Sequence, residues 1–95
     1  MSKKDAYVKK IKAQLDEWSA DIDKLQAKAQ KTEADLQLEY QEQIDKARSL
    51  RESVQHQLSE LQDAGEQAWR EFKSSVESAR DELQSALNKA SKDIQ

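Results

Sequence analysis

The sequence predicts an all-α protein: a long coiled-coil helix that folds back as a helical hairpin near residues 63–66 and self-associates. Three observations support this fold class. The 95-residue chain is rich in helix-favouring residues and contains a single glycine and no proline. Charged residues make up 37% and hydrophobic residues 36%, which leaves little material for a thick globular core. The apolar residues recur at helical spacing, so one thin seam can be buried within a single domain of residues 1–95.

The first predicted element is one long helix over residues 3–62. Ser2 and Asp5 form a capping pair that starts this helix near Lys3. From Val8 to Leu36, apolar or small residues recur in alternating steps of three and four, the heptad spacing of a left-handed coiled coil. The stretch "AKAQKTEAD", residues 27–35, weakens the seam but contains neither glycine nor proline, so we interpret it as continuous helix.

The second predicted element is an amphipathic helix over residues 66–94, which follows a turn in "QDAGEQ". Asp63 and Glu66 match a variant of the capping box at its start, and Gly65 lies within the turn. An uninterrupted helix through Gly65 would lose only about 1 kcal/mol relative to alanine and remains the alternative. Seven residues are expected to pack the hairpin: Leu58, Leu61, Trp69, Phe72, Val76, Leu83 and Leu87.

The lengths of the two helices predict self-association. At 1.5 Å per residue the first would be about 90 Å long and the second about 43 Å, so the second covers only the later half of the first. The uncovered early half would need another copy of the protein. Its expected self-association seam consists of Val8, Ile11, Leu15, Trp18, Ile22 and Leu25.

Charge and composition exclude several functions. The net charge of −3 comes from interleaved acidic and basic residues, whereas a nucleic-acid binder needs a continuous basic face. The lysines of "MSKKDAYVKKIK" are interpreted as a solvated helix end rather than a phosphate or anionic-lipid patch. No apolar run follows them and the chain has no cysteine, so we expect a cytoplasmic protein without a signal peptide or membrane anchor.

No residue pattern indicates chemistry. His56, the single histidine, has Glu52 and Glu60 four residues to either side, but a di-iron bundle needs a Glu-x-x-His pair on each of two helices. We therefore interpret His56 as an exposed surface residue. The sequence contains no glycine-rich phosphate loop and no nucleophile elbow, so neither an enzymatic activity nor a metal or cofactor is expected.

Three segments carry a resemblance: "MSKKDAYVKKIKAQLDEW", "DIDKLQAKA" and, later, "GEQAW". Together they resemble a family of small bacterial coiled-coil proteins, described either as uncharacterised or as stress-response proteins. The resemblance implies a soluble cytoplasmic protein with a stress-linked role. It supplies no active-site residues.

The function expected from the sequence is that of a non-enzymatic coiled-coil interaction protein. It would act as a homo-oligomer, with a further, unidentified protein partner also open. The alternative is a peripheral protein that binds a membrane surface through its C-terminal amphipathic helix. A third possibility is a largely unfolded stress protectant, against which the large aromatic residues at seam positions argue.

Overall fold

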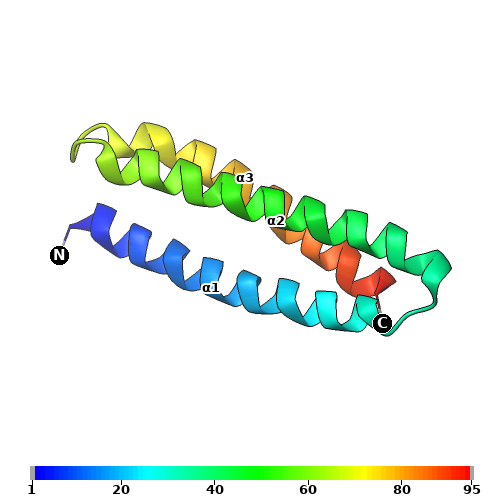
Figure 1. The fold of residues 1–95 in the computed structure, drawn as a ribbon. Coiled ribbons are helices and arrows are strands. Elements are labelled where there is room, and N and C mark those ends of the chain that lie inside the picture. The colour runs from blue at the N-terminus through cyan, green and yellow to red at the C-terminus, as the bar shows by residue number, and fades with distance from the viewer. Residues whose placement is uncertain (1, 95) are drawn as a thin grey trace.

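The computed structural model describes residues 2–94, and these form three helices without a strand. The helices are α1 (Lys3–Gln30), α2 (Ala34–Asp63) and α3 (Trp69–Asp93). They run up, down and up along one axis, and the bundle measures 51 × 19 × 17 Å. Figure 1 shows α1 and α3 each lying alongside α2, and α1 contacts α2 more extensively than it contacts α3. The all-α prediction is confirmed.

Helix α1 begins where the sequence predicts. The Ser2 hydroxyl accepts a hydrogen bond from the Asp5 backbone N–H at 3.1 Å, which satisfies one of the free donors of the first turn. Asp5 also places a negative charge near the positive end of the helix dipole.

The predicted continuous helix over residues 3–62 is wrong, because the chain turns at residues 31–33. Such a helix would be about 90 Å long, whereas the longest dimension of the bundle is 51 Å. The Lys31 and Thr32 backbone N–H groups bond three residues back, which tightens and ends α1. The Gln37 side-chain amide then donates to the carbonyls of Gln30 and Thr32, so polar side chains complete a turn that needs neither glycine nor proline.

The gain from burial explains why the helix breaks there. Interrupting it forfeits a few backbone hydrogen bonds, each worth about 0.5–1.5 kcal/mol net. Folding back lets the seam of α1 pack on α2, and each fully buried aliphatic side chain contributes about 1.5–3 kcal/mol. Ile11, Ile22 and Ile44 are all 0% exposed, so the burial terms outweigh the lost bonds.

The turn predicted near residues 63–66 is confirmed, although its chemistry differs from the prediction. Asp63 is the last residue of α2 and makes no capping bond to α3, whose N-cap is Ala68 without a side-chain bond. The turn is closed instead by the Gly65 carbonyl, which accepts from the N–H groups of Ala68 and Trp69 at 3.0 and 3.1 Å. Helix α3 therefore begins at residue 69 rather than 66.

We expect Gly65→Ala to stabilise the protein. Gly65 does not have a positive φ, and open space surrounds the position that a Cβ would occupy. Alanine would restrict the unfolded chain without straining the turn, a gain of about 0.4–1 kcal/mol. Thermal denaturation followed by circular dichroism should show Tm rising by a few degrees. A fall in Tm would mean that the turn depends on the freedom of glycine.

The core is one continuous apolar cluster along the bundle axis. Each helix contributes a stripe of aliphatic residues at helical spacing, and Tyr7, Trp18 and Trp69 lie in the same cluster. Among residues 2–94, every buried residue is hydrophobic, and none is charged. The apolar seam is therefore buried within the chain. Of the large hydrophobic side chains that the structure describes, Leu36 and Leu38 remain exposed.

Candidate interaction surfaces

The six residues of the predicted self-association seam all lie inside the bundle. Ile11 and Ile22 are 0% exposed, and the remaining four are 4–8% exposed: Val8, Leu15, Trp18 and Leu25. The prediction that they bind a second copy assumed an uncovered early half of a long helix. That assumption fails because α2 folds back along α1. Any contact between copies must therefore use another surface.

The residues predicted to pack the hairpin lie in the core or against it. Phe72 is half-buried and packs against the cluster from outside, whereas the other six belong to it: Leu58, Leu61, Trp69, Val76, Leu83 and Leu87. The core is nevertheless larger than a two-helix hairpin, because α1 adds its own stripe.

A cluster of aromatic and charged side chains joins α1 to α3 near the N-terminus. The Tyr7 and Trp69 rings pack with centroids 6.0 Å apart, and the Tyr7 hydroxyl donates to Glu77 Oε1 at 3.1 Å. Arg80 Nη1 lies 3.2 Å from Glu77 Oε2, and Lys73 Nζ lies 5.3 Å from the Tyr7 ring centroid. Burial, followed by the bond to Glu77, raises the pKa of the Tyr7 phenol, so this group stays protonated as a donor. The cluster anchors two helices and has the character of a structural contact.

The interface between α1 and α2 carries polar side chains within its apolar packing. The amides of Gln26 and Gln41 exchange hydrogen bonds at 3.0 and 3.3 Å. Arg51 occupies a seam position and its Nη1 donates to Ser19 Oγ at 3.1 Å, while its buried Nε has no partner among the described residues. A buried donor without an acceptor costs stability, so Arg51 is a weak point of the core.

We expect Arg51→Met to raise stability by about 1 kcal/mol, because it removes the unsatisfied donor and keeps an adaptable apolar chain. Urea unfolding followed by circular dichroism measures this change. Arg48→Met is the matched control, since Arg48 is 38% exposed and pairs with Asp45 at 3.8 Å. The control should change stability by less than about 0.5 kcal/mol. Destabilisation by Arg51→Met would show that the guanidinium contributes to packing.

The titratable side chains do not assemble a chemical site. His56 is 70% exposed, and its Nε2 lies 2.8 Å from Glu60 Oε1 on the next turn. Within residues 2–94, no group of three or more His, Asp or Glu side chains is arranged to hold a metal ion. Over the same residues, none of the helices has the length and apolarity needed to cross a bilayer.

The N-terminal lysines surround a shallow groove between the start of α1 and the end of α2. Lys4, Lys9 and Lys12 line it together with Asp5. The ammonium of Lys4 donates to the Ala64 carbonyl at 2.6 Å, so this lysine caps the C-terminal end of α2. Asp5 offsets part of the positive charge, and Lys4 is engaged in the cap. Both observations agree with the interpretation of these lysines as a solvated helix end.

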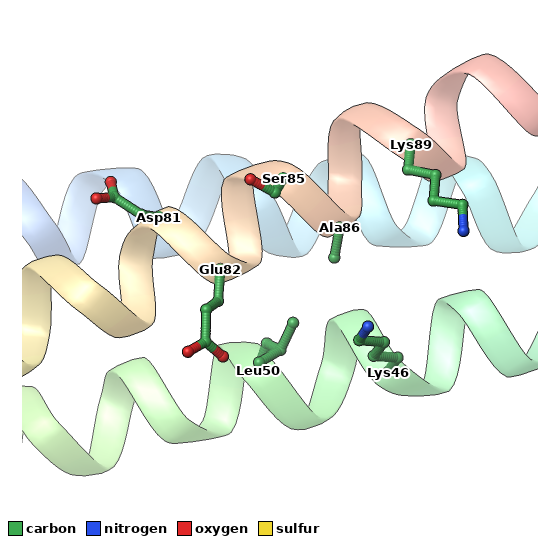
Figure 2. A pocket seen from close by; sticks show the side chains of 7 residues that line it. All are labelled: Lys46, Leu50, Asp81, Glu82, Ser85, Ala86 and Lys89. Carbon is green, nitrogen blue, oxygen red and sulfur yellow. The ribbon is translucent and has the colours of Figure 1, made fainter.

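A second groove runs between α2 and α3 on the face turned away from α1 (Figure 2). We call it the α2/α3 groove; it is lined by Lys46, Leu50, Asp81, Glu82, Ser85, Ala86 and Lys89. Its volume of about 520 Å³ is in the range of small-molecule pockets, but the groove is open along its length and would not enclose a ligand. The arrangement suits contact with another protein surface.

Sequence reasoning missed this groove because it treated α2 as having one partner. The adjacent pair Leu50 and Arg51 indicates a second packing face on this helix, because two neighbouring residues cannot both lie at the centre of the same seam. In the structure Arg51 faces α1, whereas the half-buried Leu50 lines the groove with α3. A middle helix with two neighbours needs this wider apolar face.

The outer end of α2 carries two further apolar side chains. Leu36 is 39% exposed and Leu38 is 72% exposed, both in the first turns after the residue 31–33 connection. Single exposed leucines are common on protein surfaces and do not define a site.

In comparisons with known proteins, no family model, no curated protein and no solved structure matches the chain.

Proposed function

We propose that this protein is a non-enzymatic helical interaction protein that self-associates through its outer surface. The observation that supports this proposal is that one face of the bundle is uncovered. The apolar stripes are buried inside the bundle, whereas the face of α2 and α3 opposite α1 carries an open groove. A folded rod with an open lateral face is suited to lateral contact with another protein.

Self-association is tested by sedimentation equilibrium over a wide range of protein concentration. The proposal expects a mass that rises from the monomer value of 10.9 kDa as concentration increases, and covalent dimers after mild cross-linking. A constant monomer mass up to millimolar concentration would contradict it.

Circular dichroism in dilute buffer distinguishes this proposal from an unfolded stress protectant. A folded bundle should give a strong helical signal, whereas an unfolded chain should not.

Binding to a membrane surface through α3 requires more than the native bundle offers. The apolar stripe of α3 is buried, with Val76, Leu83 and Ala90 each 0% exposed. Releasing it would expose the core of α1 and α2 as well. We therefore expect the native protein to stay at the bottom of a vesicle flotation gradient, both with neutral vesicles and with vesicles rich in anionic lipid. Flotation would favour lipid binding instead.

A stress-linked role is proposed from the resemblance of "MSKKDAYVKKIKAQLDEW" and "DIDKLQAKA" to small bacterial coiled-coil proteins. It predicts that the amount of this protein in its source cells rises after osmotic or oxidative stress. Quantitative immunoblotting before and after stress measures that rise, and unchanged levels would argue against the role.

A further inference from the structure

The charges of the α2/α3 groove are separated by sign along its length. Figure 2 shows Asp81 and Glu82 toward one end, Lys46 and Lys89 toward the other, and the side chains of Leu50 and Ala86 between them. None of the four charged groups forms a hydrogen bond or ion pair with another described residue. The groove therefore has an acidic end and a basic end, both without partners in this chain, and a small apolar centre between them.

This charge pattern is complementary to the same pattern on a second copy that is rotated by 180°. A twofold axis perpendicular to the groove, placed at its centre, brings the acidic end of one copy onto the basic end of the other. Isologous contacts of this kind, in which the same patch is used twice, are the commonest arrangement in homodimers. We propose, building on the self-association proposed above, that the α2/α3 groove is the contact surface of an antiparallel homodimer of this chain.

The charge pattern favours a second copy over other occupants. A nucleic acid or an anionic lipid surface is negative throughout and would be repelled by Asp81 and Glu82. A uniformly acidic or basic peptide would likewise match only one end of the groove. The second copy matches both ends and also places Leu50 and Ala86 against their counterparts.

The make-up of the groove also sets the kind of dimer expected. Its apolar centre is small, and exposed ion pairs act mainly by steering the encounter and fixing orientation. The serines that line the neighbouring stretch of the same face, Ser53, Ser74, Ser75 and Ser78, are short enough to let a second rod approach closely. We expect a weak, reversible dimer whose dissociation constant rises at least about tenfold between 0.02 and 0.5 M salt, as screening shortens the range of the charges.

Complementary charge reversal tests the interface. One variant carries Lys46→Glu with Lys89→Glu, which makes the groove wholly acidic, and the other carries Asp81→Lys with Glu82→Lys, which makes it wholly basic. Each alone should stay monomeric in sedimentation equilibrium at low salt, with dimerisation weakened at least about tenfold by like-charge repulsion. An equimolar mixture of the two should recover the dimer, which also shows that both variants are folded.

The control reverses two charges on α1, away from the groove. Asp21→Lys with Asp23→Lys alters exposed acids and should leave the dimer unchanged. If the native chain dimerises and the groove variants dimerise equally well, the groove is not the interface, although self-association stands. If the native chain stays monomeric at low salt and millimolar concentration, self-association and this interface both fail.

Discussion

Replacing Leu15 and Ile22 together by aspartate is expected to unfold the protein. The two side chains are 6% and 0% exposed, and both lie in the continuous core. Truncating a buried leucine or isoleucine costs about 2–5 kcal/mol, and a buried carboxylate without a partner adds to that cost. Two such sites together approach the total stability of about 5–15 kcal/mol that is typical of a small domain.

The double variant also separates two interpretations of the early seam. If the seam bound a second copy, Leu15→Asp with Ile22→Asp would yield a helical monomer. Because the seam packs on α2 of its own chain, the variant should instead lose its far-UV helical signal and sediment as an expanded monomer. Leu38→Asp is the matched control: it introduces the same charge at a leucine that is 72% exposed, and it should leave helicity and stability unchanged. Retained helicity in the double variant would contradict the three-helix packing.

The two turns show how far sequence reasoning reaches in this chain. The turn at residues 64–68 could be predicted because its single glycine stands out in a sequence without proline. The turn at residues 31–33 left no such signal, since ordinary residues close it and Gln37 supplies the capping bonds from the following helix. Local propensity favours helix through that stretch, and the packing of α1 on α2 overrides it.

The interaction surface was harder to predict than the core. Burial of Ile11, Leu15 and Ile22 follows from their period, but a period does not say whether the partner helix belongs to the same chain or to a second one. That distinction depends on a turn that the sequence does not mark. The residues that line the α2/α3 groove form no distinctive sequence motif. The separation of their charges by sign appears only when α2 and α3 lie side by side.

Trp69→Ala is expected to have the largest effect of any single substitution near the second turn. Trp69 is the first residue of α3, is 6% exposed, and packs against Tyr7 of α1. It therefore joins the start of two helices that otherwise touch little. Replacing a buried tryptophan by alanine costs about 3–5 kcal/mol. In a chain of this size the Tm should fall by more than about 12 °C.

The loss should begin locally. Hydrogen exchange of the Trp69→Ala variant should accelerate first at the start of α1 and of α3, because both lose the same aromatic contact, whereas amides around Ile22 and Ile44 keep more of their protection. Trp18, which is 5% exposed near the middle of α1, remains as a fluorescent reporter of global unfolding.

Two control variants test whether the loss of stability in Trp69→Ala comes from the packing of the Trp69 ring. Trp69→Phe keeps an aromatic side chain against Tyr7 and should retain most of the stability. Phe72→Ala removes a ring that is only half-buried and should cost less than Trp69→Ala. If all three variants unfolded at the same urea concentration as the native chain, the contact between Tyr7 and Trp69 would not hold α1 to α3, and the bundle would depend on α2 alone to keep its outer helices together.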